Sequence, residues 1–68
     1  MLICNLYYYR NLLGFTQKEL AVKLNVSNNT ISNIELGKFF PSALLTYKIL
    51  SLFNISFFDL FIFQETLL

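Results

Sequence analysis

Apolar residues recur along the chain at helical rather than strand spacing, and turn signals divide the pattern into five segments. The first predicted helix covers about 2–13 and ends at Gly14. The second covers 17–24, because Thr16 and Glu19 form the ends of a capping box. In such a box the threonine hydroxyl accepts hydrogen bonds from the first amides of the helix, and the glutamate side chain reaches back to accept from the threonine N–H. The inward residues of this helix are Leu20, Ala21 and Leu24.

A short turn over 25–27 separates the second predicted helix from the third. Ser27 is a suitable N-cap, and Gly37 is placed to end the helix as a C′ glycine. Ile31 and Ile34 lie one turn apart and form its inner stripe. The segment 16–35 therefore has the dimensions of a helix-turn-helix.

Two further helices are expected in the second half of the chain. A fourth opens at Pro41-Ser42, and Ser56 caps a fifth over about 57–63. The apolar face of the fourth contains Leu45, Ile49, Leu52 and Phe53. Five short helices with tight turns predict an all-α bundle in one domain, residues 1–68.

The composition excludes several classes of function. The chain has no histidine, one cysteine and four acidic residues, so it lacks an imidazole base and an internal disulfide. A metal centre would have to be built from these few carboxylates. We therefore expect neither an enzyme nor a metal-binding or cofactor-binding protein.

Hydrophobicity is high: 56% of the residues are apolar and 13% are charged, against about 25% charged in typical domains. A membrane span needs about 20 uninterrupted apolar residues, whereas the longest charge-free stretch within 39–68 is Ile49–Phe58. The first cation, Arg10, follows the apolar start, which is not the order of a secretory signal. We expect a cytoplasmic chain that does not bind membranes.

The outer face of the helix predicted after Ser27 is polar but uncharged. Its residues are Asn28, Asn29, Ser32 and Asn33, followed by Leu36. An asparagine amide matches N6 and N7 of adenine in the major groove. Asparagine also costs a helix roughly 0.5 kcal/mol per residue relative to alanine, so a cluster on one exposed face indicates a site. The alternative is compositional, since seven of the 68 residues are asparagine.

Several motifs together resemble the lambda-repressor/Cro family of helix-turn-helix DNA-binding domains, over about residues 6–61. They are Arg10, Gly14–Ala21, Leu24–Ser27, Thr30-Ile31-Ser32, Ile34-Glu35, Gly37-Lys38, Pro41-Ser42 and Leu60-Phe61. The resemblance implies a lambda-repressor-like fold that binds double-stranded DNA and needs no cofactor.

The resemblance also implies roles for individual residues. Base edges would be contacted by Asn28, Asn29, Ser32 and Asn33, and phosphates by Gln17, Ser27 and Lys38. Arg10 and Glu35 match a pair that forms an internal salt bridge in relatives. Physical chemistry favours the same pairing, because Glu35 lies near the C-terminal end of its helix, where the helix dipole disfavours an anion.

The chain departs from the family pattern in its aromatic residues. Phe39 and Phe40 stand where a polar or basic residue is usual, and the predicted recognition helix has no arginine or lysine. Apolar residues in excess of the core needs are Phe58, Ile62, Phe63, Leu67 and Leu68. We expect the fifth helix and the tail, 62–68, to form a two-fold homodimer. The alternative is that the tail folds over the core.

Two functions therefore remain open. The first is a small dimeric repressor that reads an inverted-repeat operator. The second is a protein-interaction module on the same fold, such as an antitoxin or regulatory partner, that acts through Phe39, Phe40 and the aromatic tail.

Overall fold

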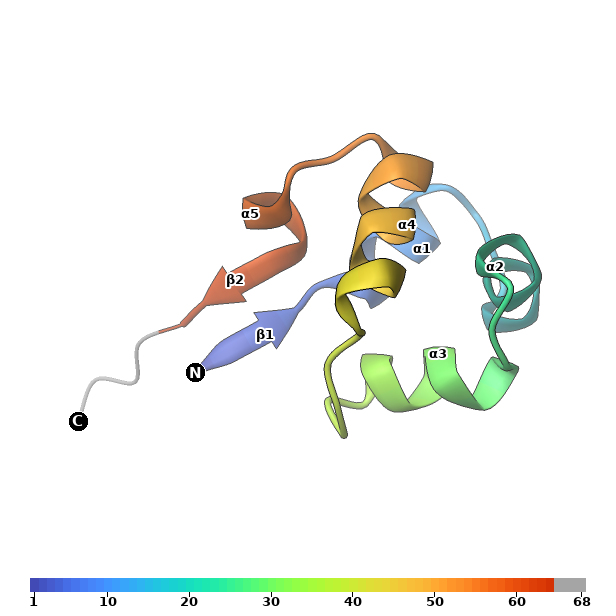
Figure 1. Cartoon of the computed structure of the whole chain (residues 1–68), viewed down its shortest axis with the longest axis horizontal. Coiled ribbons are helices and arrows are strands. Elements are labelled where there is room, and N and C mark those ends of the chain that lie inside the picture. The colour runs from blue at the N-terminus through green and yellow to red at the C-terminus, as the bar shows by residue number, and fades with distance from the viewer. Residues whose placement is uncertain (65–68) are drawn as a thin grey trace.

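The computed structural model describes residues 1–64, and five short helices make up most of it (Figure 1). In chain order the elements are β1 (Leu2–Cys4), α1 (Leu6–Leu12), α2 (Gln17–Leu24), α3 (Asn28–Glu35), α4 (Ala43–Phe53), α5 (Phe57–Leu60) and β2 (Phe61–Phe63). The predicted all-α helix-turn-helix fold is confirmed, with the addition of a minor two-stranded sheet.

Side-chain caps begin four of the five helices where the sequence places them. Thr16 Oγ1 accepts from the Glu19 N–H at 3.0 Å, and Glu19 Oε1 accepts from the Thr16 N–H at 2.9 Å. Ser27 and Ser42 cap α3 and α4, and Ser56 begins α5 in a second capping box. These bonds satisfy amides that have no partner within the helix.

Two of these helices are followed by asparagine in the left-handed conformation. Asn25 after α2 has φ 57°, and Asn54 after α4 has φ 55°. Asparagine tolerates this region better than most side chains. In both places the chain can turn sharply without glycine.

The prediction of helix is wrong at both ends of the described chain. Residues 2–4 form β1 rather than the start of α1, and 61–63 form β2 rather than the end of α5. The strands are antiparallel, with Ile3 opposite Ile62. Short runs of β-branched and aromatic residues suit a strand as well as a helix. The choice depends on pairing between the two ends of the chain, which no local pattern reveals.

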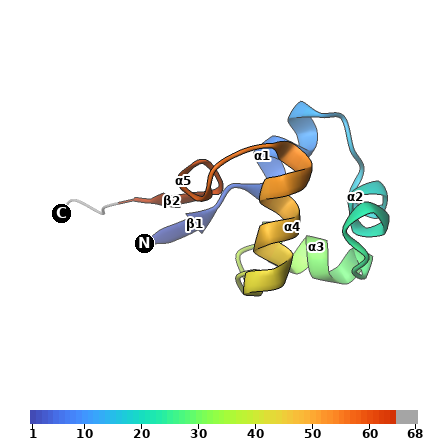
Figure 2. The same cartoon turned by 45° about the horizontal axis from the view of Figure 1, so that its top comes forward.

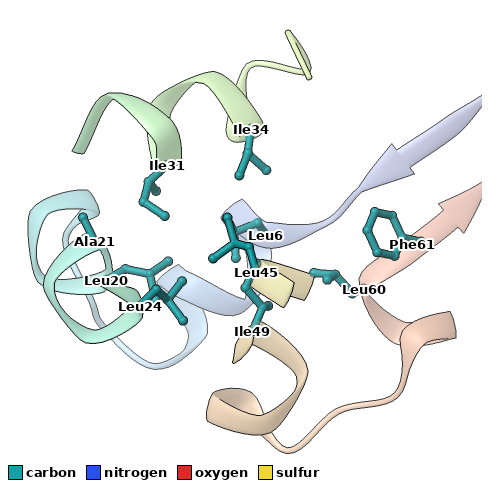
Figure 3. Close-up of a cluster of buried hydrophobic side chains, with 10 residues drawn as sticks. All are labelled: Leu6, Leu20, Ala21, Leu24, Ile31, Ile34, Leu45, Ile49, Leu60 and Phe61. Atoms are coloured by element: carbon teal, nitrogen blue, oxygen red, sulfur yellow. The ribbon is translucent and has the colours of Figure 1, made fainter. Parts of the chain in front are cut away.

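The core lies where α1, α2, α3 and α4 converge (Figure 3). Its completely buried members come from these four helices and α5: Leu6, Leu20, Leu24, Ile31, Ile34, Ile49 and Leu60. Leu52, predicted on the inner face of α4, is instead exposed, and Phe53 is half-buried against the core. The sheet extends from the helical body on the side away from α2 (Figures 1 and 2).

The capping box at the start of α2 predicts a specific dependence of stability on pH. Hydrogen bonds from Thr16 lower the pKa of Glu19 below its ordinary value of 4.5, the backbone N–H having the largest effect. Because the folded pKa is the lower one, this stabilisation is present above about pH 4.5 and is lost as the pH falls through the folded pKa.

Replacing Glu19 with glutamine keeps the shape of the side chain and removes its charge. We expect wild type to melt at a higher temperature than Glu19→Gln at pH 7, and the difference to shrink steadily below about pH 4.5. Thermal unfolding followed by circular dichroism between pH 7 and pH 3 measures both. A difference that stays constant over this range would contradict the assignment.

Candidate nucleic-acid interface

The helix-turn-helix is formed by α2, the turn over 25–27, and α3. Ala21 is buried where the two helices meet, and its carbonyl accepts from the Val26 N–H at 3.0 Å. Val26 packs against the core from inside the turn, as its apolar side chain predicts. Figure 2 shows α3 along one end of the molecule, next to α2. This geometry leaves one long side of α3 open.

The two sides of α3 differ in burial as its sequence predicts. Ile31 and Ile34 point into the core (Figure 3). Asn28 and Asn29 are exposed, whereas Ser32 and Asn33 are half-buried. Within residues 1–64, the three asparagine amides of this helix make no side-chain hydrogen bond. Their donors and acceptors are therefore available to a ligand.

A buried ion pair connects the ends of the helix-turn-helix to α1. The Arg10 Nε and Nη2 atoms donate to the two carboxylate oxygens of Glu35, with 3.0 Å between Nη2 and Oε1. Arg10 Nη1 also donates to the Phe15 carbonyl at 2.8 Å. The side chains are only 10% and 5% exposed. The hydrogen bond with Glu35 raises the pKa of Arg10, so the guanidinium stays charged in the fold.

The structure places the three residues predicted to contact phosphate around α3. Gln17 is the first residue of α2, and its Nε2 donates to Glu35 Oε1 at 3.0 Å. Ser27 caps α3, with its Oγ 3.1 Å from the Thr30 N–H. Lys38 is exposed just beyond α3. The contact of Gln17 with Glu35 was not expected from the sequence, since 18 residues separate them.

Comparison with known proteins agrees with this geometry. The pattern of the helix-turn-helix family matches residues 6–60, which is most of the chain. The chain belongs to the helix-turn-helix family. The resemblance found in the sequence motifs is thereby confirmed.

Relatives with this helix-turn-helix occur in archaea and bacteria. An uncharacterized HTH-type transcriptional regulator of Methanocaldococcus jannaschii is 47% identical over 60 residues, which cover 88% of this chain and 91% of the relative. A similar regulator of Archaeoglobus fulgidus is 47% identical over 57 residues, covering 84% and 81%. ImmR, an HTH-type transcriptional regulator of Bacillus subtilis, is 43% identical over 47 residues, covering 69% of this chain and 37% of ImmR.

This helix-turn-helix protein has a second surface of interest, which is apolar. Of the residues predicted to form a dimer, Phe58 is 85% exposed and Phe63 is 71% exposed, and Ile62 is exposed to a smaller extent. Leu67 and Leu68 lie outside the described residues. Phe39 and Phe40, after α3, are also exposed. The three described members of this predicted set are therefore exposed.

An open apolar groove lies between the sheet, α4 and α5. It is lined by Leu2, Phe40, Tyr47, Leu50, Phe57 and Phe61, among others. Sequence reasoning missed Leu2 and Phe57 as part of this surface, because the groove forms only when β1 pairs with β2.

Within the described part of the chain, no helix is long and apolar enough to cross a membrane. In the same residues, no three side chains of histidine, cysteine, aspartate or glutamate come together as a possible metal site.

The buried pair predicts a large effect on stability when one partner is removed. Replacing Arg10 with methionine leaves the Glu35 carboxylate buried without its cation, which typically costs about 3–5 kcal/mol of unfolding free energy. Urea denaturation measures this loss. The control, Lys38→Met, removes an exposed cation and should change the unfolding free energy by less than about 0.5 kcal/mol. Equal unfolding free energies for Arg10→Met and wild type would show that the pair is energetically idle.

Proposed function

We propose that this protein is a sequence-specific DNA-binding transcriptional regulator that reads the major groove with α3. The observation that carries the proposal is the outer face of α3, where uncharged hydrogen-bonding side chains are open to solvent and Ile31 and Ile34 hold the helix on the core. The relatives support it, since they are named transcriptional regulators, which are not a class of enzyme. We also propose a cytoplasmic location, because a transcriptional regulator has to reach the DNA that it binds.

Base readout is assigned to the four polar residues of this face. They are Asn28, Asn29, Ser32 and Asn33. An asparagine amide can make two hydrogen bonds with adenine at once: its nitrogen donates to N7, and its oxygen accepts from the N6 amino group. The proposed half-site therefore contains A·T pairs.

Phosphate binding is assigned to Gln17, Ser27 and Lys38. The first two stand at the starts of α2 and α3, where helix amides favour an anion. Lys38 lies beyond the other end of α3, so the three residues flank the proposed base-reading face. Contacts at both ends of a recognition helix fix its register without reading sequence.

Dimerisation is proposed because a single copy has little charge with which to bind DNA. The formal net charge is +1, and the lysines near the helix-turn-helix neutralise only about three phosphates. A two-fold dimer through Phe58, Ile62, Phe63, Leu67 and Leu68 would double these contacts. It would place two recognition helices roughly 34 Å apart on an inverted repeat. Occupying such an operator would block transcription.

A second candidate function is a protein-interaction module, an antitoxin or regulatory partner on the same fold. Its support is the exposure of Phe39 and Phe40, together with the apolar groove that Phe40 lines. Aromatic side chains at the rim of a groove are typical of protein interfaces. The open polar face of α3 favours DNA as the first candidate.

Removing the amides of Asn28 and Asn29 tests the DNA-reading role. A duplex is first recovered from random sequences by binding to wild type. The double alanine variant should bind this duplex with an affinity about tenfold or more below that of wild type. Circular dichroism should show an unchanged fold, because both side chains are exposed. The control is Asn11→Ala, which removes an exposed asparagine from α1. Unchanged affinity in the double variant would show that these amides do not read bases, and a folded wild-type protein that recovers no duplex would favour the interaction module.

The proposed dimer predicts a concentration-dependent mass. Sedimentation at micromolar concentration should reveal a species of twice the 8.0 kDa chain mass. Replacing Phe58 and Phe63 with glutamate should abolish it, because two charges would be buried at the interface without partners. Leu12→Glu introduces a charge at an exposed apolar position of α1 and should leave the dimer intact. A wild-type sample that contains only single chains would exclude this dimer.

A further inference from the structure

The side chain of Gln17 lies between the buried ion pair and the exposed start of α2. It is half-buried, while its neighbours Thr16 and Lys18 are exposed. Its Nε2 atom donates to the same Glu35 oxygen that accepts from Arg10 Nη2, each at 3.0 Å. One carboxylate oxygen therefore joins residues from α1, α2 and α3.

The chemistry of Glu35 fixes which end of the Gln17 amide faces it. An ionised carboxylate only accepts hydrogen bonds, so the amide must turn its nitrogen toward Glu35 and its oxygen away. Phosphate oxygens of DNA likewise only accept. The Nε2 atom carries a second hydrogen, and this N–H is the donor that Gln17 retains for a phosphate.

The ion pair makes this arrangement compatible with DNA. A bare carboxylate close to a phosphate would repel it. Two hydrogen bonds from Arg10 neutralise Glu35 without using Gln17. The bond with Gln17 is thus a third contact, additional to what the carboxylate needs for its charge.

We infer that Glu35 is a positioning residue for DNA binding: it holds the amide of Gln17 so that the remaining N–H is directed at a phosphate. The inference rests on the proposed function, since the Gln17–phosphate contact is part of it. Glu35 itself does not touch DNA and acts through Gln17. Holding the donor in place before binding reduces the ordering cost of association.

A double-mutant cycle on Gln17→Ala and Glu35→Asp tests this inference. Aspartate keeps the charge that Arg10 needs, but its side chain is one methylene shorter and withdraws the carboxylate from Gln17. Affinity is measured by fluorescence anisotropy at fixed salt, using a duplex recovered from random sequences, and is corrected for the folded fraction. We expect Glu35→Asp to weaken binding roughly fivefold when Gln17 is present and by less than about twofold in the Gln17→Ala background.

Two controls separate positioning from general loss of stability. Ile49→Val loosens the core from α4, outside the helix-turn-helix, and the folded protein should bind the duplex as wild type does. Asn11→Ala removes an exposed side-chain amide from α1 and should also bind normally. If Glu35→Asp does not fold, Gln17→Asn is used instead: it leaves the Arg10–Glu35 pair intact, but its shorter amide withdraws from Glu35 Oε1, so affinity should fall toward that of Gln17→Ala. Wild-type affinity for Gln17→Asn would then overturn the positioning role.

The outcomes distinguish this inference from the function on which it rests. If Glu35→Asp weakens DNA binding by the same factor with Gln17 and with Ala at position 17, the positioning role alone is overturned. This outcome requires that the protein still binds DNA. A folded wild-type protein that binds no duplex would overturn the proposed function and the inference with it. A coupled loss of affinity in the cycle, with normal binding by both controls, supports the inference.

Discussion

The carboxylate of Glu35 links the helix-turn-helix to α1 through a buried ion pair. It lies at the end of α3, where the helix dipole disfavours an anion, and it is nearly completely buried. Arg10 compensates from α1 with two donors and reaches the loop before α2 through the Phe15 carbonyl. The angle between α3 and the other helices is therefore held by a polar contact as well as by Ile31 and Ile34.

This attachment explains how α3 tolerates a sequence that forms a weak isolated helix. Three asparagines within six positions disfavour helix formation. The Ser27 cap, the buried isoleucines and the pair at its end offset that cost through contacts with other elements. The outer face is then free to carry side chains chosen for hydrogen bonding rather than for helix stability, as expected for a surface that reads DNA.

Local signals made much of the fold predictable. Capping residues such as Thr16 and Ser56 mark helix starts because their hydrogen bonds reach only three residues along the chain. The spacing of Ile31 and Ile34 likewise determined which side of α3 is buried. The pairing of Arg10 with Glu35 was accessible because an anion at a helix end needs a cation and the family motifs contain both.

The features that sequence reasoning missed depend on contacts between distant segments. The strands form because residues 2–4 meet 61–63 across the whole chain, and the apolar groove beside them follows from that pairing. The bond from Gln17 to Glu35 depends on how α2 crosses α3. Neither contact leaves a periodic or capping signal in the sequence, so only the folded arrangement reveals them.

The most direct test of DNA reading by α3 follows the side-chain amides during binding. Nuclear magnetic resonance of nitrogen-15-labelled protein resolves the NH₂ groups of Asn28, Asn29, Asn33 and Gln17 as they meet a duplex recovered from random sequences. We expect these four resonances to shift on addition of DNA, while that of Asn11 in α1 stays in place. Shifts confined to the backbone around Phe39, Phe40 and β2, with the α3 amides unmoved, would contradict DNA reading by α3.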